Sequence, residues 1–147
     1  MIKGIEMKYI MLLLALALGS STSIAAGYND LDDELETANQ LIVKEQFKQA
    51  IEILENAIDS EPNNADAWNL LGYASRKSGD LETSAKAYGK ALRFDPDHRD
   101  ALEYQGELFL MLGDKAAAEN NLAKLNLLCP NGCEQAEMLM KAIVASE

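Results

Sequence analysis

"SEPNNADAWNLLGYASRKSGD" spans Ser60 to Asp80, and "FDPDHRDALEYQGELFLMLGD" from Phe94 to Asp114 repeats its order of turn, small and apolar residues thirty-four positions later. The three prolines of the chain keep the same interval, because they stand at positions 62, 96 and 130. Self-similarity at a fixed period of about 20–50 residues is typical of stacked supersecondary units. The sequence therefore predicts a repeat protein.

Aligning the chain on its prolines gives three units, residues 31–64, 65–98 and 99–132. Two columns of this alignment hold small residues, as expected where two helices approach closely. The column in the first half of each unit contains Ala38, Gly72 and Gly106. The column in the second half contains Ala50, Ser84 and Ala118. Each unit is thus predicted to be a tight hairpin of two helices.

The residues between the two halves agree with helix ends. "SGD" at 78–80 and "LGD" at 112–114 place a glycine where one helix stops and an aspartate where the next begins. Glycine is the usual residue just past a helix, and aspartate is a preferred N-cap. The first unit departs from this pattern, since Glu45 stands where the others have glycine.

Trp68-x-x-Leu71-Gly72, followed by Ala91 and Pro96, resembles the signature of the tetratricopeptide repeat. The resemblance covers residues 31–132 and implies an all-α fold, a right-handed solenoid of three helix-turn-helix repeats, with Trp68 buried between units. A capping helix is expected over 133–145, with its apolar residues on the stack. Those residues are Ala136, Leu139, Met140 and Ile143.

The first 26 residues have the plan of a secretory signal peptide. Lys8 precedes the apolar run Ile10 to Leu18, and a polar stretch of small residues follows it. This run is too short to cross a bilayer, which requires about 20 apolar residues in a helix. We expect cleavage after Ala26, or after Ala25, and the start at Met7 is an alternative to the start at Met1. No cysteine lies near the junction to carry a lipid anchor.

The remaining residues, 27–147, are expected to form one tetratricopeptide domain in the periplasm or outside the cell. The formal net charge of the whole chain is −11. A strongly acidic chain repels nucleic acid and anionic lipid surfaces, so the expected partner is a protein or peptide. The oligomeric state stays open. No catalytic motif is recognisable, and we predict neither an enzyme nor a cofactor.

In the resembled family, ligands lie in the concave surface lined by the first helix of each repeat. Carrying those columns over predicts a groove formed by Asn39, Asn69, Tyr73, Arg76, Glu103, Tyr104 and Glu107, with Met138 nearby. Glu103 and Glu107 argue against a clamp for an acidic peptide terminus. Tyr73 and Tyr104 are the strongest candidates, because exposed aromatic rings mark contact surfaces. A plain solvated helix face is the alternative.

Cys129 and Cys133 flank a Pro-Asn-Gly turn and are the only cysteines in the chain. An exported protein favours a disulfide, which would fasten the capping helix to the last repeat. The surrounding residues also resemble the ends of small exported bacterial tetratricopeptide proteins that carry such a pair. The alternative is a thiol or copper site. A copper site would need a third ligand, but the sole histidine, His98, is expected to be an exposed turn residue.

Three functions follow from these expectations. The first is an exported, non-catalytic scaffold that binds a peptide or protein segment in its groove. The second is a thiol or metal carrier acting through Cys129 and Cys133. The third is a structural subunit of a larger envelope complex.

Overall fold

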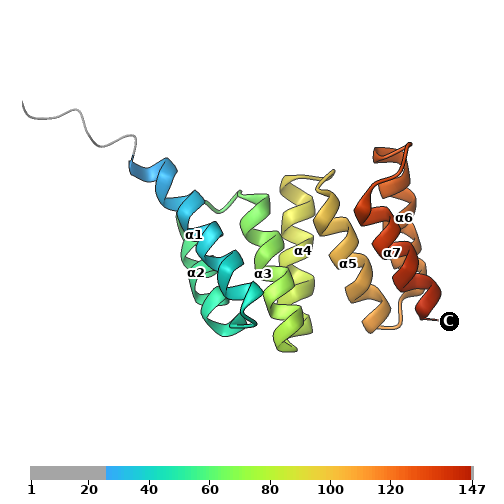
Figure 1. Cartoon of the computed structure of the whole chain (residues 1–147), viewed down its shortest axis with the longest axis horizontal. Helices are drawn as coiled ribbons and strands as arrows, with labels where there is room; N and C mark the ends of the chain where they lie inside the picture. The colour runs from blue at the N-terminus through green and yellow to red at the C-terminus, as the bar shows by residue number, and fades with distance from the viewer. Residues whose placement is uncertain (1–25, 147) are drawn as a thin grey trace, which may run out of the picture.

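The computed structural model describes residues 26–146, which form seven helices and no strand (Figure 1). The helices are α1 (Ala26–Val43), α2 (Phe47–Ser60), α3 (Ala65–Ser78), α4 (Leu81–Phe94), α5 (Arg99–Met111), α6 (Lys115–Leu128) and α7 (Glu134–Ala145). Residues 27–30, at the start of the expected domain, already belong to α1. The predicted signal peptide lies outside the described residues, apart from Ala26.

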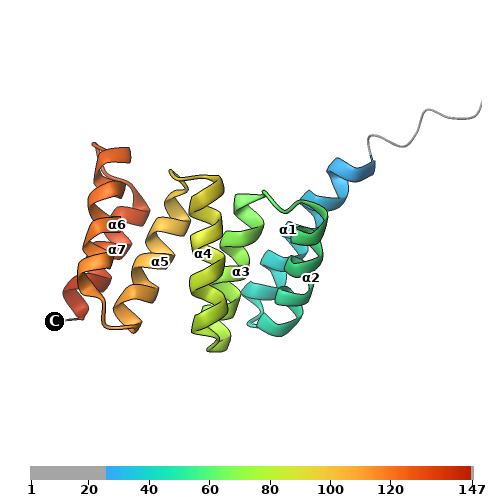
Figure 2. The same ribbon diagram turned by 180° about the vertical axis from the view of Figure 1, so that it is seen from behind.

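The helices form a row of antiparallel hairpins. α1 packs on α2, α3 on α4 and α5 on α6, while α7 packs on both α5 and α6. Figure 1 looks onto α1, α3, α5 and α7, and the reverse view in Figure 2 brings α2, α4 and α6 to the front. The predicted fold class is confirmed: a right-handed α-solenoid of three helical hairpins closed by a capping helix.

The turns inside the second and third hairpins follow the predicted chemistry. Gly79 and Gly113 have φ angles of 93° and 80°, in the left-handed region that favours glycine. The side chain of Asp80 accepts a hydrogen bond from the backbone N–H of Thr83 at 3.0 Å. Asp114 caps α6 in the same way. These local signals fix where α4 and α6 begin.

The turn of the first hairpin has neither the glycine nor the aspartate cap. Glu45 has a φ of 57°, and among the described residues it alone has a positive φ without being glycine. Gln46, the N-cap of α2, makes no side-chain hydrogen bond to the helix. This turn therefore carries backbone strain and leaves a helix N-terminus without a side-chain cap.

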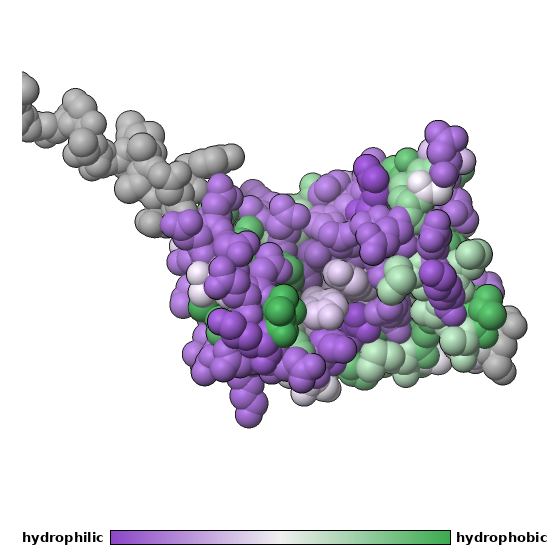
Figure 3. All heavy atoms as spheres, in the orientation of Figure 1, coloured by the Kyte–Doolittle hydropathy of each residue, from purple (hydrophilic) through white to green (hydrophobic). Residues whose placement is uncertain are grey.

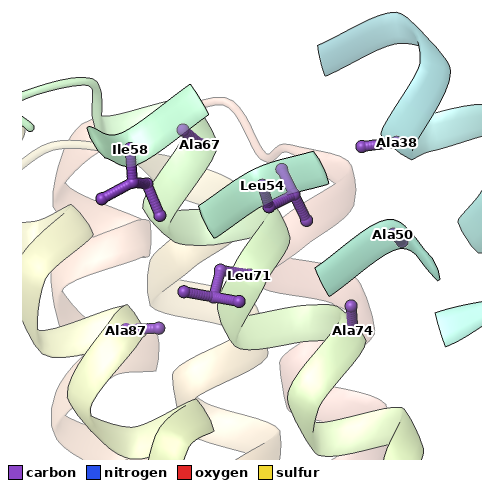
Figure 4. Packing of buried hydrophobic residues seen from close by; sticks show 8 residues of the cluster. All are labelled: Ala38, Ala50, Leu54, Ile58, Ala67, Leu71, Ala74 and Ala87. Carbon is purple, nitrogen blue, oxygen red and sulfur yellow. The ribbon is translucent and has the colours of Figure 1, made fainter. Parts of the chain in front are cut away.

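The core consists of two clusters of apolar side chains. The first joins α1 to α4 and contains Ala38, Ala50, Leu54, Ile58, Ala67, Leu71, Ala74 and Ala87 (Figure 4). The second joins α5 to α7 and contains Leu102, Ala118, Leu125, Ala136, Leu139 and Ile143. Alanines are frequent because the paired helices approach closely, as the small-residue columns predicted.

Gly72 and Gly106 mark the closest approaches between helices. A Cβ atom on Gly72 would lie 2.6 Å from the ring of Tyr88 in α4, the partner helix of its own hairpin. A Cβ atom on Gly106 would lie 2.6 Å from Leu139 in α7. The nearest atoms to a Cβ on Gly106 therefore belong to the capping helix and not to α6, the second helix of the same hairpin. The capping helix fills that place because it packs directly on α5.

The capping helix and the tryptophan each depart partly from expectation. Ala136, Leu139 and Ile143 are buried as expected, but Met140 is 50% exposed because it lies on the side of α7 turned away from the stack. Trp68 is only half-buried at the edge of the first cluster. Its indole N–H donates to the carbonyl of Pro62 at 2.8 Å, in the loop that joins the first hairpin to the second. The ring is therefore at the junction of two units as expected, but it is not fully buried there.

Candidate functional site

A hollow of about 390 Å³ opens between α3, α5 and α7, all on the face seen in Figure 1. Its lining residues are Tyr73, Arg76, Lys77, Asp100, Glu103, Tyr104, Glu107, Glu134, Gln135 and Met138. Five of the seven residues predicted from the sequence come together here, and so does Met138. The hollow lies on the side formed by the first helix of each hairpin.

Asn39 and Asn69 do not line this hollow. Asn39 is exposed on α1, at the far end of the row. Asn69 is 4% exposed, and its side-chain oxygen is buried without a hydrogen-bond partner among the described residues. The repeat alignment alone could not distinguish a position that lines the groove from a position that is buried by packing.

Two tyrosine rings form the aromatic part of the hollow. The ring centroids of Tyr73 and Tyr104 lie 4.9 Å apart at an interplanar angle of 56°, and both side chains are partly exposed. The guanidinium carbon of Arg76 lies 5.5 Å from the first ring centroid and 5.8 Å from the second. This packing holds the two rings in place, which lowers the entropy cost of using them as a contact surface.

Arg76 is committed to an ion pair across the hollow. Its Nη2 atom lies 2.6 Å from a carboxylate oxygen of Glu107, and the two side chains are 10% and 26% exposed. The pair joins α3 to α5 and neutralises Glu107 in a partly water-free setting. The charge of Arg76 is therefore balanced within the protein.

Glu103 has no such partner. It is 6% exposed, and within residues 26–146 its carboxylate has no hydrogen bond or ion pair. Burial is the largest cause that raises the pKa of Glu103 to about 7, and the negative charges of Glu107, Asp100 and Glu134 contribute to this increase, against a smaller lowering by Arg76. The hollow therefore contains a carboxyl group that gains or loses its proton near neutral pH.

The same environment also shifts the pKa of the neighbouring Tyr104 hydroxyl. Burial is the largest cause that raises this pKa to about 12, and the charge of Glu103 contributes to the same increase. The Tyr104 hydroxyl thus stays protonated at physiological pH and remains a hydrogen-bond donor.

Four lining residues were missed by the sequence reasoning, namely Lys77, Asp100, Glu134 and Gln135. A signal for two of them was present, because Asp100 and Glu134 occupy the same repeat column at the start of successive first helices. The Gln135 side chain donates to Asp100 at 2.7 Å, which ties the capping helix to α5 at the edge of the hollow.

Two other hollows formed by the described residues have a different lining. One, of about 480 Å³, lies at the outer end of the row between α1 and α2, and no aromatic residue lines it. A second lies around His98, and most of its lining residues are aspartates from the loop before α5 and from the first turns of α3 and α5. His98 was expected to be a solvated turn residue, and this is wrong, because its side chain is only 9% exposed. Its Nδ1 accepts from the N–H of Ala101 as the N-cap of α5, and its Nε2 lies 2.9 Å from Asp66.

The two cysteines lie at the junction of α6 and α7. Their sulfur atoms are within disulfide-bonding distance, and their Cα atoms are 5.7 Å apart, a usual separation for a disulfide. Within residues 26–146 no group of three or more His, Cys, Asp or Glu side chains is arranged to hold a metal ion. Over the same range, none of the helices has the length and apolar character needed to cross a membrane.

Comparison with known proteins places this fold. The model of the tetratricopeptide repeat matches residues 35–97 and 76–124. Among curated relatives, the TPR repeat-containing thioredoxin TTL4 of Arabidopsis thaliana is 27% identical over 76% of this chain, and Protein FlbA of Caulobacter vibrioides is 27% identical over 74%. The chain spans only 16% and 18% of the length of these two relatives.

Solved structures of low sequence identity share the fold. The type III secretion translocator chaperone SycD of Yersinia enterocolitica superposes with a TM-score of 0.72 at 16% identity, covering 80% of this chain and 92% of that one. The first TPR of Spaghetti (RPAP3), bound to the HSP90 peptide SRMEEVD, gives a TM-score of 0.69 at 17% identity, covering 78% and 91%. With the repeat model matched over most of the helical region, the chain belongs to the tetratricopeptide repeat family.

Proposed function

We propose that the protein is an exported, non-catalytic scaffold that binds an extended segment of a partner protein in the hollow between α3, α5 and α7. The observation that carries this proposal is the packed, partly exposed pair of Tyr73 and Tyr104 in the wall of that hollow. Tyrosine offers a large contact area at a small loss of side-chain entropy, and exposed aromatic pairs are enriched at binding hot spots.

Proteins of the same fold support a peptide ligand. The tetratricopeptide domains of RPAP3 were solved with the HSP90 peptide SRMEEVD and the HSP70 peptide SGPTIEEVD. The charges of this chain differ from what such acidic peptides require, because Glu103 and Glu107 line the hollow. The proposal therefore takes the mode of binding from those neighbours and not the peptide.

Site-specific photo-crosslinking in living cells tests the location. A photoreactive side chain at Met138, which is exposed and lines the hollow, should capture a partner protein. The same group at Glu52, which is exposed on α2 of the opposite face, should capture none. Capture from Met138 should also disappear when Tyr73 and Tyr104 are both replaced by alanine. Equal capture from both positions, or capture that survives the double replacement, would contradict the proposal.

The proposal that the protein is exported rests on the predicted signal peptide at residues 1–26, and it is tested separately. Mass spectrometry of the protein from a soluble periplasmic fraction should find a chain that begins at Gly27, or at Ala26. A chain that keeps residues before Ala26 and stays with the membranes would refute export with cleavage.

A specific observation favours a second candidate, the subunit of a larger complex. Within the described residues, large apolar side chains that are exposed lie mostly in the C-terminal third, at Met111, Leu112, Leu127, Met138, Met140 and Val144. Figure 3 shows apolar surface gathering toward this end, whereas the end formed by α1 and α2 is mostly hydrophilic. Exposed apolar patches mark interaction sites on soluble proteins.

A further inference from the structure

The hollow has an unbalanced set of charges. Four carboxylates and two cationic side chains line it. Arg76 is paired with Glu107, and Asp100 accepts a hydrogen bond from Gln135. Lys77 is exposed at the end of α3. The internal pairing thus leaves one buried carboxylate over.

That carboxylate is Glu103. It is more than nine-tenths buried, lines the hollow, and has no partner among residues 26–146. A buried carboxylate is costly unless it is paired and hydrogen-bonded. A folded protein that retains one next to an open hollow has a place where a cation from outside would be stabilised.

We propose that the hollow selects a peptide segment carrying a lysine or arginine, whose charged head lies against Glu103 while its aliphatic stem lies along Tyr73 and Tyr104. This inference deepens the proposed function and rests on it. Lysine and arginine suit the site because they combine a long apolar stem with a cationic head. Tyrosine rings add a cation–π attraction to a head group that lies over them.

The charges around Glu103 favour the same class of ligand. Asp100 and Glu107 come from its own helix, Glu134 comes from α7, and Arg76 from α3 is neutralised by Glu107. An acidic segment would meet like charges, which is unfavourable in a partly water-free site. A basic segment would meet Glu103, Asp100 and Glu134 together.

Binding should release a proton. Because the pKa of Glu103 is about 7 in the free protein, Glu103 is protonated in a large fraction of the protein molecules near neutral pH. A cation binds the ionised form, so affinity should increase as the pH rises from about 6 to about 8. Calorimetry in buffers of different ionisation enthalpy measures the proton released per peptide bound.

The experiment uses a library of short random linear peptides displayed on phage, selected on the protein purified from the cells that produce it. Selected peptides should be enriched in lysine and arginine. Glu103→Gln, which keeps the shape of the side chain, should weaken the best peptide by about tenfold or more, as expected for loss of a partly buried ion pair. The matched control Glu52→Gln removes the same charge from α2 and should bind normally.

A double-mutant cycle identifies the contact. Replacing the basic residue of the peptide by glutamine should cost as much as Glu103→Gln, and the two changes together should cost little more than either alone. The proton release on wild-type protein gives a second measurement that does not depend on how the variant folds. No proton release would count against the inference.

The outcomes separate this inference from the proposed function. Peptides without basic enrichment, or peptides bound equally by Glu103→Gln, overturn the inference while leaving the proposed function intact if Tyr73→Ala with Tyr104→Ala abolishes binding. A library that yields no peptide, or peptides insensitive to the tyrosine replacements, overturns both.

Discussion

Two glycines in neighbouring helices should respond to alanine in opposite ways. A Cβ atom on Gly72 would lie 2.6 Å from the Tyr88 ring, and Tyr88 is fully buried, so it cannot move aside. Gly72→Ala should lower the free energy of unfolding by about 1–3 kcal/mol, the usual cost of overpacking a core. Gly89 lies in the interior of α4 with nothing within 4 Å of an added Cβ atom.

Gly89→Ala should therefore raise the free energy of unfolding by up to about 1 kcal/mol, because alanine loses less backbone entropy than glycine in a helix. Denaturation by urea measures both variants. Equal effects of the same sign would contradict the packing described for α3 and α4.

The turn between α1 and α2 offers a second prediction at the residue scale. Glu45 and Gln46 occupy the positions that hold glycine and aspartate in the other two hairpins. Glu45→Gly removes the cost of a φ of 57°, and Gln46→Asp supplies a side-chain cap to α2. Each change should raise the free energy of unfolding by about 0.5–1 kcal/mol.

Thermal unfolding of the single variants and the double variant measures these effects. Lys48→Ala, at an exposed position in the first turn of α2, serves as the control and should leave stability nearly unchanged. A double variant no more stable than the wild type would show that this turn is not strained.

Glu103 links stability to pH. Its pKa is about 7 in the folded protein against 4.5 in an exposed glutamate, so the folded state holds the proton more tightly than the unfolded state. The contribution of this group to the free energy of unfolding is complete below about pH 4.5 and is lost as the pH rises through about 7. Asp100, Glu107, Glu134 and Arg76 surround it and shape this shift.

Glu103→Gln removes the titrating group. The variant should match the wild type near pH 5 and exceed its free energy of unfolding near pH 8 by on the order of 1–3 kcal/mol. Glu52→Gln should show the wild-type profile. A constant difference between Glu103→Gln and the wild type at every pH would show that Glu103 does not titrate in this range.

The repeat register predicted more about backbone positions than about side-chain surroundings. Gly79, Gly113, Asp80 and Asp114 act through their own turns, so their roles could be inferred from local sequence. Asn69 and Glu103 share one repeat column, yet Asn69 is sealed in the core and Glu103 opens onto the hollow. That difference depends on which helix packs above each one, and a pattern within one unit does not contain it.

At the scale of the helices, the capping helix α7 links the fold to the candidate site. Its inner side packs Leu139 against Gly106, while Glu134, Gln135 and Met138 contribute to the hollow. The position of α7 therefore controls both the end of the core and one wall of the site. Its start at Glu134 directly follows Cys133.

Loss of the cysteine pair should loosen that start. Replacing Cys129 and Cys133 by serine removes a constraint on the unfolded chain worth about 2 kcal/mol in the chain-entropy model for so short a loop. The melting temperature should fall, while peptide binding by folded protein should stay within about twofold. A reducing agent should lower the melting temperature of the wild type to that of the double variant and leave the melting temperature of the double variant unchanged.

Alkylation followed by mass spectrometry, on protein taken directly from cells, reports the state of the two thiols. Cysteines that react without prior reduction would contradict a structural disulfide, and a stoichiometric bound metal would favour the carrier alternative. The prediction rests on the 5.7 Å separation of the two Cα atoms and on the position of the pair at the beginning of α7.

The row of helices as a whole ends in two different ways. α7 lies where the first helix of a further repeat would lie, and its outer side carries Met140 and Val144, which are 50% and 62% exposed. Leu127 on the adjoining α6 is 82% exposed. A solenoid whose terminal helix keeps an apolar outer side has a surface that a further helix can cover.

We expect this end to associate, either with a second copy of the protein or with another subunit. Met140→Lys with Val144→Lys should abolish concentration-dependent association in light scattering, because a charge buried at an apolar contact is costly. Val43→Lys alters an even more exposed apolar residue at the end of α1, far along the row, and should have no effect. The lysine variants should keep full peptide binding, since neither residue lines the hollow. A wild type that stays monomeric at every concentration, and whose partners in cells are unchanged by Met140→Lys with Val144→Lys, would show that this apolar end is merely solvated.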